Sequence, residues 1–243
     1  MIGIRWPGRR ATYRHLQKRA RRVLRPAWLG TLRRVTPLSQ QWGYDRGTPV
    51  DRYYIERFLE RHRNDIRGRV LEVKDSASTE RWGIGVTQAD VLDIDPANPR
   101  ATVVADLGVE GALEAEAFDC CLIVQTLLYV PDPAVAVRTL WRALRPGGVL
   151  LLTVPGITRV DPILSATDYW RFTPAVCRRL LGDAFGPEHV DVEGHGNVLA
   201  AIAFLAGMGY EELSRREREV TDPAYPLIVT ARAVKGERRP AVP

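Results

Sequence analysis

Short apolar runs alternate along this chain with segments whose apolar residues recur at helical spacing. The runs fall near residues 69–74, 90–95, 101–105, 118–124, 148–154, 189–194 and 226–234. Their aliphatic and β-branched composition predicts strands that are buried on both faces. Because helical segments separate them, the pattern favours a mostly parallel sheet covered by helices on both sides.

The helical segments carry clear start and stop signals. Residues 49–66 place Tyr54, Phe58 and Ile66 on one face, and Gly68 follows. This spacing predicts an amphipathic helix that packs against the sheet.

Two proline-containing pairs mark later helices. Asp132–Pro133 opens a helix that Pro146–Gly147–Gly148 closes, and Thr173–Pro174 opens another over 174–181. A capping side chain before a proline at the first helical position is a common helix start.

A basic amphipathic segment precedes this body. Residues 9–24 place apolar side chains at helical spacing and fill the other face with Arg and Lys. Three interpretations stay open: a solvated helix, a helix that binds an anionic membrane or an acidic partner, and a nucleic-acid contact. Pro26, Gly30 and Pro37 then predict a linker.

Charge is divided unevenly between this arm and the body. Of the 35 Lys and Arg residues, 11 lie in residues 1–34, and no Asp or Glu precedes Asp45. The rest of the chain contains 24 basic and 29 acidic residues, so the arm carries a net charge of +11 and the body one of −5. A nucleic-acid-binding domain spreads positive charge over its folded surface, so this distribution disfavours nucleic acid as the partner.

Composition and cysteine usage are those of a soluble globular protein, with 45% hydrophobic and 26% charged residues. The apolar stretch Val198–Met208 is too short to span a bilayer, and no apolar segment resembles a secretory signal.

Cys120, Cys121 and Cys177 fit no metal spacing. We expect a cytoplasmic protein with reduced, buried cysteines; peripheral membrane association through the arm stays open.

Polar side chains follow the first four strands at their carboxyl ends. Glu72 lies near the end of the first, Asp95 ends the second, Asp106 the third and Gln125 the fourth. In a doubly wound sheet, ligands bind at this edge, where the strand order reverses. The set therefore predicts a nucleoside site.

The order "VLEV", "LDID", "VVADL", "FDCCLIVQTLLYVPD" and "LRPGG" resembles the class I S-adenosylmethionine-dependent methyltransferases over residues 45–236. The resemblance implies a Rossmann-like α/β fold: a doubly wound, mostly parallel sheet of seven strands with one antiparallel strand. It also implies S-adenosylmethionine as the cofactor. We expect residues 1–44 to form the basic helical arm and linker, 45–236 the methyltransferase-like domain and 237–243 a disordered tail.

By position, the resemblance implies particular contacts to the cofactor. Glu72 is the acidic residue of the first motif, Asp95 accepts the ribose hydroxyls, and Asp106, followed by Leu107, accepts the adenine amino group. Gln125 lies beside the methionine portion.

The first motif departs from the family, because Lys74, Ser76 and Ser78 stand where relatives carry three glycines. Glycine permits positive φ and close backbone approach. Two interpretations stay open: a working loop, in which Lys74 points away and the serine hydroxyls hold the methionine carboxylate, or a lost cofactor site. "WGYDRGTPVDRYYIERFL" and "DYWRFTP" resemble a branch found with glycosyltransferases in surface-polysaccharide pathways, whose openings are similarly glycine-poor.

Motifs for other chemistry are missing: the chain has no G-x-G-x-x-G after a strand, no phosphate loop, no metal spacing and no G-x-S-x-G. Methylation of a hydroxyl needs a base. The candidates are Tyr129, Asp168, His189 and His195, the last with the alternative of a turn histidine. Two segments supply candidate substrate contacts: Arg46, Arg52, Tyr53, Tyr169, Trp170 and Arg171.

These observations predict a methyltransferase that acts on a hydroxyl of a saccharide or glycosylated metabolite. A second hypothesis is a non-catalytic, methyltransferase-like scaffold that binds a glycosyltransferase. A third, weaker one is an RNA methyltransferase recruited by the arm.

Overall fold

The computed structural model describes residues 30–236. The chain divides into two compact units, Met1–Pro37 and Leu38–Pro243. The expected basic helix over 9–24 and the tail 237–243 lie outside the described residues. In the first unit the structure describes the 3₁₀ helix η1 (Gly30–Leu32). All of the elements described below belong to the second unit.

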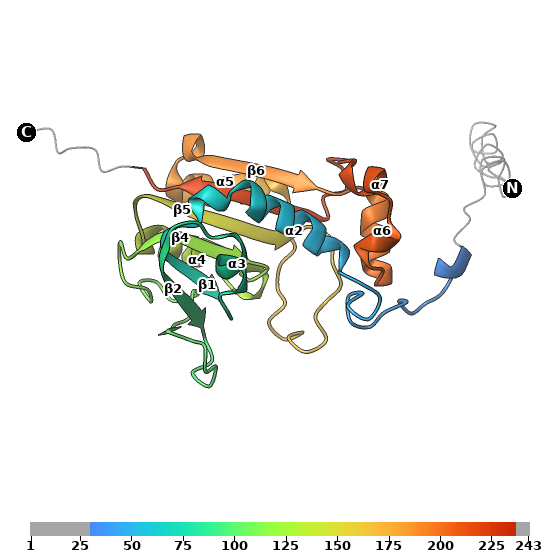
Figure 1. Ribbon diagram of the computed structural model, residues 1–243, viewed down its shortest axis with the longest axis horizontal. Coiled ribbons are helices and arrows are strands. Elements are labelled where there is room, and N and C mark those ends of the chain that lie inside the picture. The colour runs from blue at the N-terminus through green and yellow to red at the C-terminus, as the bar shows by residue number, and fades with distance from the viewer. Residues whose placement is uncertain (1–29, 237–243) are drawn as a thin grey trace, which may run out of the picture. The chain divides into compact units, whose positions relative to one another are not determined.

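A seven-stranded sheet with the order β3-β2-β1-β4-β5-β7-β6 forms the centre of this unit (Figure 1). The strands are β1 (Gly68–Val73), β2 (Val86–Asp93), β3 (Val103–Val104), β4 (Phe118–Val124), β5 (Leu144–Pro155), β6 (Val190–His195) and β7 (Ile228–Val234). Strand β7 runs antiparallel to both β5 and β6, and the other pairs are parallel. The expected sheet, with one antiparallel strand, is confirmed.

Helices cover both faces of the sheet. On one face lie α2 (Val50–Arg61), α3 (Ala77–Trp82) and α6 (Val198–Ala206), and on the other α4 (Pro133–Ala143) and α5 (Pro174–Phe185). The short elements are η2 (Arg63–Asp65), η3 (Leu127–Tyr129), η4 (Pro187–His189), η5 (Tyr210–Glu212) and α7 (Arg215–Glu219). The sheet is thus doubly wound.

Successive residues of β4 belong to different layers of the core. Cys120 packs in the cluster with Phe58 of α2 and Phe204 of α6, whereas Cys121 packs with Leu140 of α4. This follows from the two-residue period of a strand, which sends neighbouring side chains to opposite faces. Both thiols are free and buried, as is Cys177, and burial raises the pKa of each. The expectation of reduced, buried cysteines is confirmed.

Two predicted helix starts are confirmed by their caps. The Asp132 side chain accepts hydrogen bonds from the Ala134 and Val135 amides, and Pro133 begins α4. Thr173 caps α5 in the same way, through the amide of Val176. These caps satisfy amides that have no partner inside the helix.

The structure differs from the prediction where β5 begins. Pro146–Gly147–Gly148 was expected to separate a helix from a strand, but β5 starts at Leu144, directly after α4. The pairing register with β4 shifts between Phe118 and Cys120, and Gly147 has φ +78°. The glycines therefore accommodate an irregularity within the strand.

Other boundaries and elements also differ. The second strand covers Val86–Asp93, so it ends two residues before the expected position. The apolar stretch from Val198 forms α6, which Asn197 caps through the Ala200 amide. Within residues 30–236, no helix is both long enough and apolar enough to cross a membrane.

Candidate functional site

The strand order reverses between β1 and β4, and the residues that follow these two strands have unusual backbones. Lys74, directly after β1, has φ +74°, and Gln125, directly after β4, has φ +50°. Non-glycine residues adopt this left-handed region at a cost of about 1–3 kcal/mol, and such residues cluster at functional sites. The edge where the fold predicts a ligand therefore carries local strain.

Glu72 organises the loop of the first motif. Its buried carboxylate accepts hydrogen bonds from the Ser78 amide at 3.0 Å, the Thr79 amide at 2.8 Å and the Thr79 hydroxyl at 2.8 Å. These bonds hold the first turn of α3 against the end of β1. Nearby, the Ser76 hydroxyl donates to Oε1 of Glu80 at 2.6 Å.

A polar cluster lies at the end of β2. Asp93, the last residue of the strand, is 2% exposed. Its Oδ1 accepts from Lys74 Nζ and from the Asp95 amide, both at 3.0 Å, and its Oδ2 accepts from Asn98 Nδ2 at 2.7 Å. Burial alone would raise the pKa of Asp93, but these hydrogen bonds outweigh it and the pKa is lowered.

The other expected cofactor contacts lie at the neighbouring strand ends. Asp95, just beyond β2, and Asp106, just beyond β3, are exposed, and the Oδ1 of each accepts a bond from a backbone amide two residues ahead. Leu107 is buried and packs in the core, so its side chain supports this edge from within.

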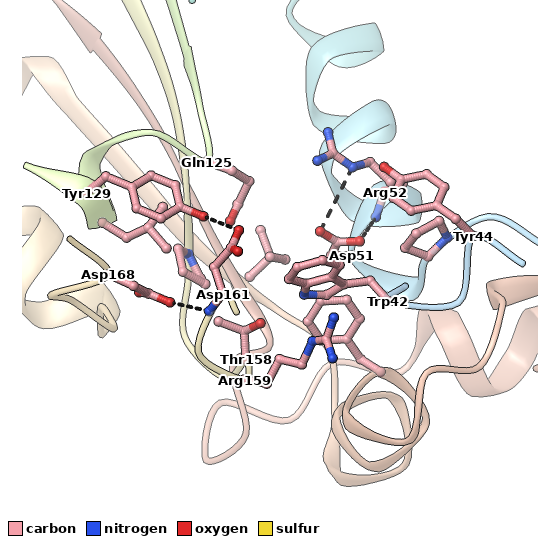
Figure 2. Close-up of a pocket in the computed structure, with 15 residues that line it drawn as sticks. Trp42, Tyr44, Asp51, Arg52, Gln125, Tyr129, Thr158, Arg159, Asp161 and Asp168 are labelled. Atoms are coloured by element: carbon pink, nitrogen blue, oxygen red, sulfur yellow. Dashed lines mark hydrogen bonds and ion pairs between the residues drawn. The ribbon is translucent and has the colours of Figure 1, made fainter. Parts of the chain in front are cut away.

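A pocket of about 200 Å³ lies next to Gln125, on the side of β4 that faces β5 (Figure 2). It is lined by Trp42, Tyr44, Pro49, Asp51, Arg52, Gln125, Leu128, Tyr129, Pro155, Thr158, Arg159, Asp161, Asp168, Phe204 and Ile228. It therefore brings together four of the expected site residues: Arg52, Gln125, Tyr129 and Asp168.

Two of the expected bases are held in unreactive states inside this pocket. The Tyr129 hydroxyl donates to Oδ2 of Asp161 at 3.3 Å, and burial together with that carboxylate raises the pKa of Tyr129 to about 12. The Asp168 carboxylate is paired with Arg171, whose hydrogen bonds lower the pKa of Asp168. Neither group is poised to accept a proton near neutral pH.

Asp51 is a third acid in the pocket, and it was not among the candidate bases that the sequence suggested. It lies in the first turn of α2 and is 8% exposed, and burial raises the pKa of its carboxyl. Its Oδ1 accepts from the Arg52 amide at 2.9 Å. Figure 2 shows Asp51 and Arg52 across the pocket from Gln125 and Tyr129. An acid soon after Pro49 was visible in the sequence, but no local signal shows that this turn faces the end of β4.

Two arginines of the pocket carry unsatisfied donors. Among the described residues, the buried Nε atoms of Arg52 and Arg159 have no hydrogen-bond partner. The Arg159 guanidinium also stacks over the Trp42 ring, at 3.9 Å from the centroid. A buried donor without a partner is costly, so the pocket is suited to a ligand that offers oxygen acceptors.

His195 lies in a different hollow from the pocket. Its Nε2 is 2.7 Å from the Thr230 hydroxyl and its ring stacks on Tyr54. Burial lowers the pKa of His195. Tyr53 lines this second hollow too, so the structure separates both residues from Gln125 and Tyr129.

The remaining expected substrate contacts hold loops in place. Arg46 forms two hydrogen bonds with the Glu212 carboxylate. Arg171 binds Asp168 and the carbonyls of the loop after β5. Tyr169 and Trp170 are 48% and 41% exposed, and the Trp170 indole donates to the Val130 carbonyl.

Comparisons with known proteins agree with this architecture. Residues 67–152 match the methyltransferase domain family. A S-adenosylmethionine-dependent methyltransferase from Mesorhizobium loti superposes with a TM-score of 0.52 at 16% identity, covering 76% of this chain and 99% of the other. One from Archaeoglobus fulgidus gives 0.50 at 14% identity, covering 76% and 94%. No curated protein matches the chain.

The match over residues 67–152 includes the ends of β1, β2, β3 and β4, where the strained turns and the carboxylates lie. The expected cofactor, S-adenosylmethionine, is the one that a methyltransferase domain uses. Residues 67–152 therefore match a methyltransferase domain, and the sheet domain has the fold of S-adenosylmethionine-dependent methyltransferases.

Proposed function

We propose that this protein transfers a methyl group from S-adenosylmethionine to a hydroxyl of a saccharide or glycosylated metabolite, with Asp51 as the base. The observation that carries the proposal is the pocket beside Gln125, in which a buried carboxylate faces the carboxyl end of β4. The cofactor supplies an activated methyl on its sulfonium, so the chain has to orient the acceptor and remove its proton.

The strand-end residues fit the cofactor chemically. Asp95 and Asp106 present exposed carboxylates at neighbouring strand ends, where ribose hydroxyls and an amino group require acceptors. Asp93 fits the ribose better than Asp95, because β2 ends at Asp93. We therefore move the ribose assignment from Asp95 to Asp93.

Asp51 is the pocket acid best suited to take a proton from a hydroxyl. Arg171 neutralises Asp168, and Asp161 is engaged by Tyr129 and by two amides of its own loop. Oδ2 of Asp51 is 4.0 Å from Arg52 Nε, which is longer than a hydrogen bond, so Arg52 does not occupy this oxygen through Nε. Arg52 would then stabilise the carboxylate after the substrate enters.

The lining of the pocket favours an oxygen-rich acceptor. The unsatisfied Nε atoms of Arg52 and Arg159 need acceptors, and Trp42 adds an aromatic ring to the lining. At about 200 Å³ the pocket is smaller than the roughly 300–1,000 Å³ of sites that enclose a drug-sized ligand. This size suits one ring of a larger acceptor.

Methyl transfer to a panel of hexose and deoxyhexose glycosides tests the proposal, with methyl-labelled cofactor as donor. We expect label in at least one glycoside, and Asp51→Asn should lower its transfer rate about 10²–10⁴-fold, the usual contribution of a general base. Asp161→Asn is the matched control, because this acid lines the same pocket but has its oxygens engaged. An equal loss in both variants, or none in Asp51→Asn, rejects Asp51 as the base.

One observation favours the scaffold as a second candidate: the carboxylate of Asp93 is already bound by Lys74 and Asn98. Calorimetry with S-adenosylhomocysteine separates the two functions. The enzyme should bind with micromolar affinity, about −8 kcal/mol. The absence of heat and of any thermal shift at millimolar ligand would favour the scaffold.

A further inference from the structure

The Asp93 carboxylate is close to saturated with hydrogen bonds. A carboxylate offers about four acceptor positions. Lys74 Nζ and the Asp95 amide occupy two at Oδ1, and Asn98 Nδ2 occupies a third at Oδ2. A ribose diol that binds here donates two hydrogen bonds, but only about one position remains. One of the three donors has to leave before the diol can bind.

The three donors differ in how easily they can leave. The Asp95 amide is part of the backbone. The Asn98 side chain also donates to the Lys74 carbonyl, at 3.0 Å, so it holds two parts of the site together. The Lys74 side chain is 65% exposed, and its flexible stem can carry the ammonium into solvent. Lys74 is therefore the donor that can leave at the lowest cost.

We propose that Lys74 is a specificity-determining residue that competes with the cofactor ribose for Asp93. The inference rests on the proposed function, because it takes S-adenosylmethionine as the ligand of the site. In the free protein the ammonium of Lys74 occupies the position that one ribose hydroxyl takes in the complex. A ligand with a vicinal diol can displace it, whereas a ligand with a single hydroxyl gains less from doing so.

The backbone at Lys74 strengthens this assignment. The residue keeps φ +74°, a conformation that glycine adopts without strain. The loop thus keeps a left-handed turn at this position although Lys74 is not glycine. The Lys74 side chain forms an ion pair with the buried Asp93, so a lysine here adds a cation to the site and leaves the backbone of the loop unchanged.

Because of this competition, the apparent Kd equals the intrinsic Kd divided by the fraction of molecules in which Asp93 is free of Lys74. If the ion pair is formed in nine of ten molecules, the cofactor binds about tenfold more weakly than its contacts allow. Removing the ammonium should recover that factor, which corresponds to about 1.4 kcal/mol.

Calorimetric titration with S-adenosylhomocysteine tests the inference on the full-length protein and three variants. Lys74→Met removes the ammonium but keeps the strained backbone and most of the stem, and Lys74→Gly removes both. We expect both variants to bind about tenfold tighter than the parent. Arg100→Ala is the matched control, because it removes a nearby cation that pairs with Asp75, at 3.8 Å, and leaves Asp93 untouched. Its affinity should be unchanged, and thermal unfolding verifies that each variant is folded.

The outcomes separate this inference from the proposed function. Binding by the parent with no gain in Lys74→Met overturns the competition and leaves the methyltransferase proposal intact. Weaker binding by Lys74→Met also overturns it, because the ammonium would then contact the cofactor. Binding by both Lys74 variants but not by the parent supports the competition and rejects methyl transfer by the parent. No binding by any folded variant overturns both.

Discussion

At the scale of single residues, Lys74 shows how a substitution can preserve a backbone while changing a site. The absence of glycine at this position predicts a strained or altered turn, because positive φ is unfavourable for other residues. The structure keeps the turn and adds the pair with Asp93. The position of the anomaly could be predicted, but the partner of the lysine could not, because Asp93 ends the neighbouring strand β2, 19 residues further along the chain.

A prediction at this scale concerns the pH dependence of methyl transfer. Burial raises the pKa of Asp51, and a base acts only when deprotonated. The rate should therefore fall on the acid side at a pH above the ordinary aspartate value of about 3.9. A profile of kcat/KM against pH measures this limb, which should be missing in Asp51→Asn.

Unfolding provides an independent measure of the same group. A carboxyl with a raised folded-state pKa binds its proton more tightly in the native state, so it costs stability as pH rises from the unfolded pKa through the folded one. Asp51→Asn should lose this decline. If the kcat/KM profile of Asp51→Asn falls at acid pH in the same way as that of the parent, Asp51 is excluded as the source of that fall.

At the scale of elements, an ion pair ties the exit of α2 to the sheet. Asp65 of η2 accepts two hydrogen bonds from Arg232 of β7, at 2.8 and 2.9 Å. Burial alone would raise the pKa of Asp65, but the bonds from Arg232 and His62 outweigh it, so the pKa lies below its usual range. The contact joins two residues that are 167 positions apart in the sequence.

We predict that Asp65→Asn lowers the free energy of unfolding by about 1–2 kcal/mol at pH 7. This is the lower part of the range for hydrogen bonds to charged groups, because the pair is partly exposed. A depressed carboxyl pKa stabilises the native state above about pH 3.9 and loses this effect as pH falls through the folded value. Urea unfolding at pH 7 and pH 3 should therefore show a smaller difference between parent and variant at the lower pH.

The Arg61–Glu193 pair offers a control for this measurement. Its atoms are 2.9 Å apart, but the two side chains are 54% and 45% exposed. Glu193→Gln should change stability by less than about 0.5 kcal/mol. Equal losses in Asp65→Asn and Glu193→Gln would mean that the bidentate contact adds nothing beyond an ordinary surface pair.

Elements with strong local signals were predictable, and those defined by tertiary packing were not. The pairs Asp132–Pro133 and Thr173–Pro174 fix their helix starts locally, so α4 and α5 were expected there. In contrast, α6 is apolar on all sides, which gives it no helical periodicity to detect. For the same reason the strand-end acids could be identified from sequence order, whereas Asp51 entered the site through the packing of α2.

At the scale of the whole molecule, the arm and the sheet domain carry opposite charge. Met1–Pro37 holds the 11 basic residues of the arm and no acid, and the second compact unit begins at Leu38. The Leu38 amide donates to the Ala206 carbonyl at 2.7 Å, so a truncated chain should keep this residue.

We predict that a chain beginning at Leu38 folds and binds S-adenosylhomocysteine with the affinity of the full-length protein. It should lose salt-sensitive association with anionic vesicles, because each basic side chain near such a surface contributes about 1 kcal/mol within a Debye length of about 8–10 Å. Vesicle sedimentation at low and high salt measures the second effect. Loss of ligand binding on truncation, or no vesicle association by the full-length protein at low salt, would contradict the prediction.

The opposite orientations of Cys120 and Cys121 make one short peptide a reporter on both halves of the core. An alkylating reagent can reach Cys120 only when the layer of α2 and α6 opens, and Cys121 only when the layer of α4 opens. A protease fragment that contains both residues records the two events in its mass. Singly modified fragments would reveal molecules in which one layer has detached, and a jump from none to two adducts would reveal that the layers separate together.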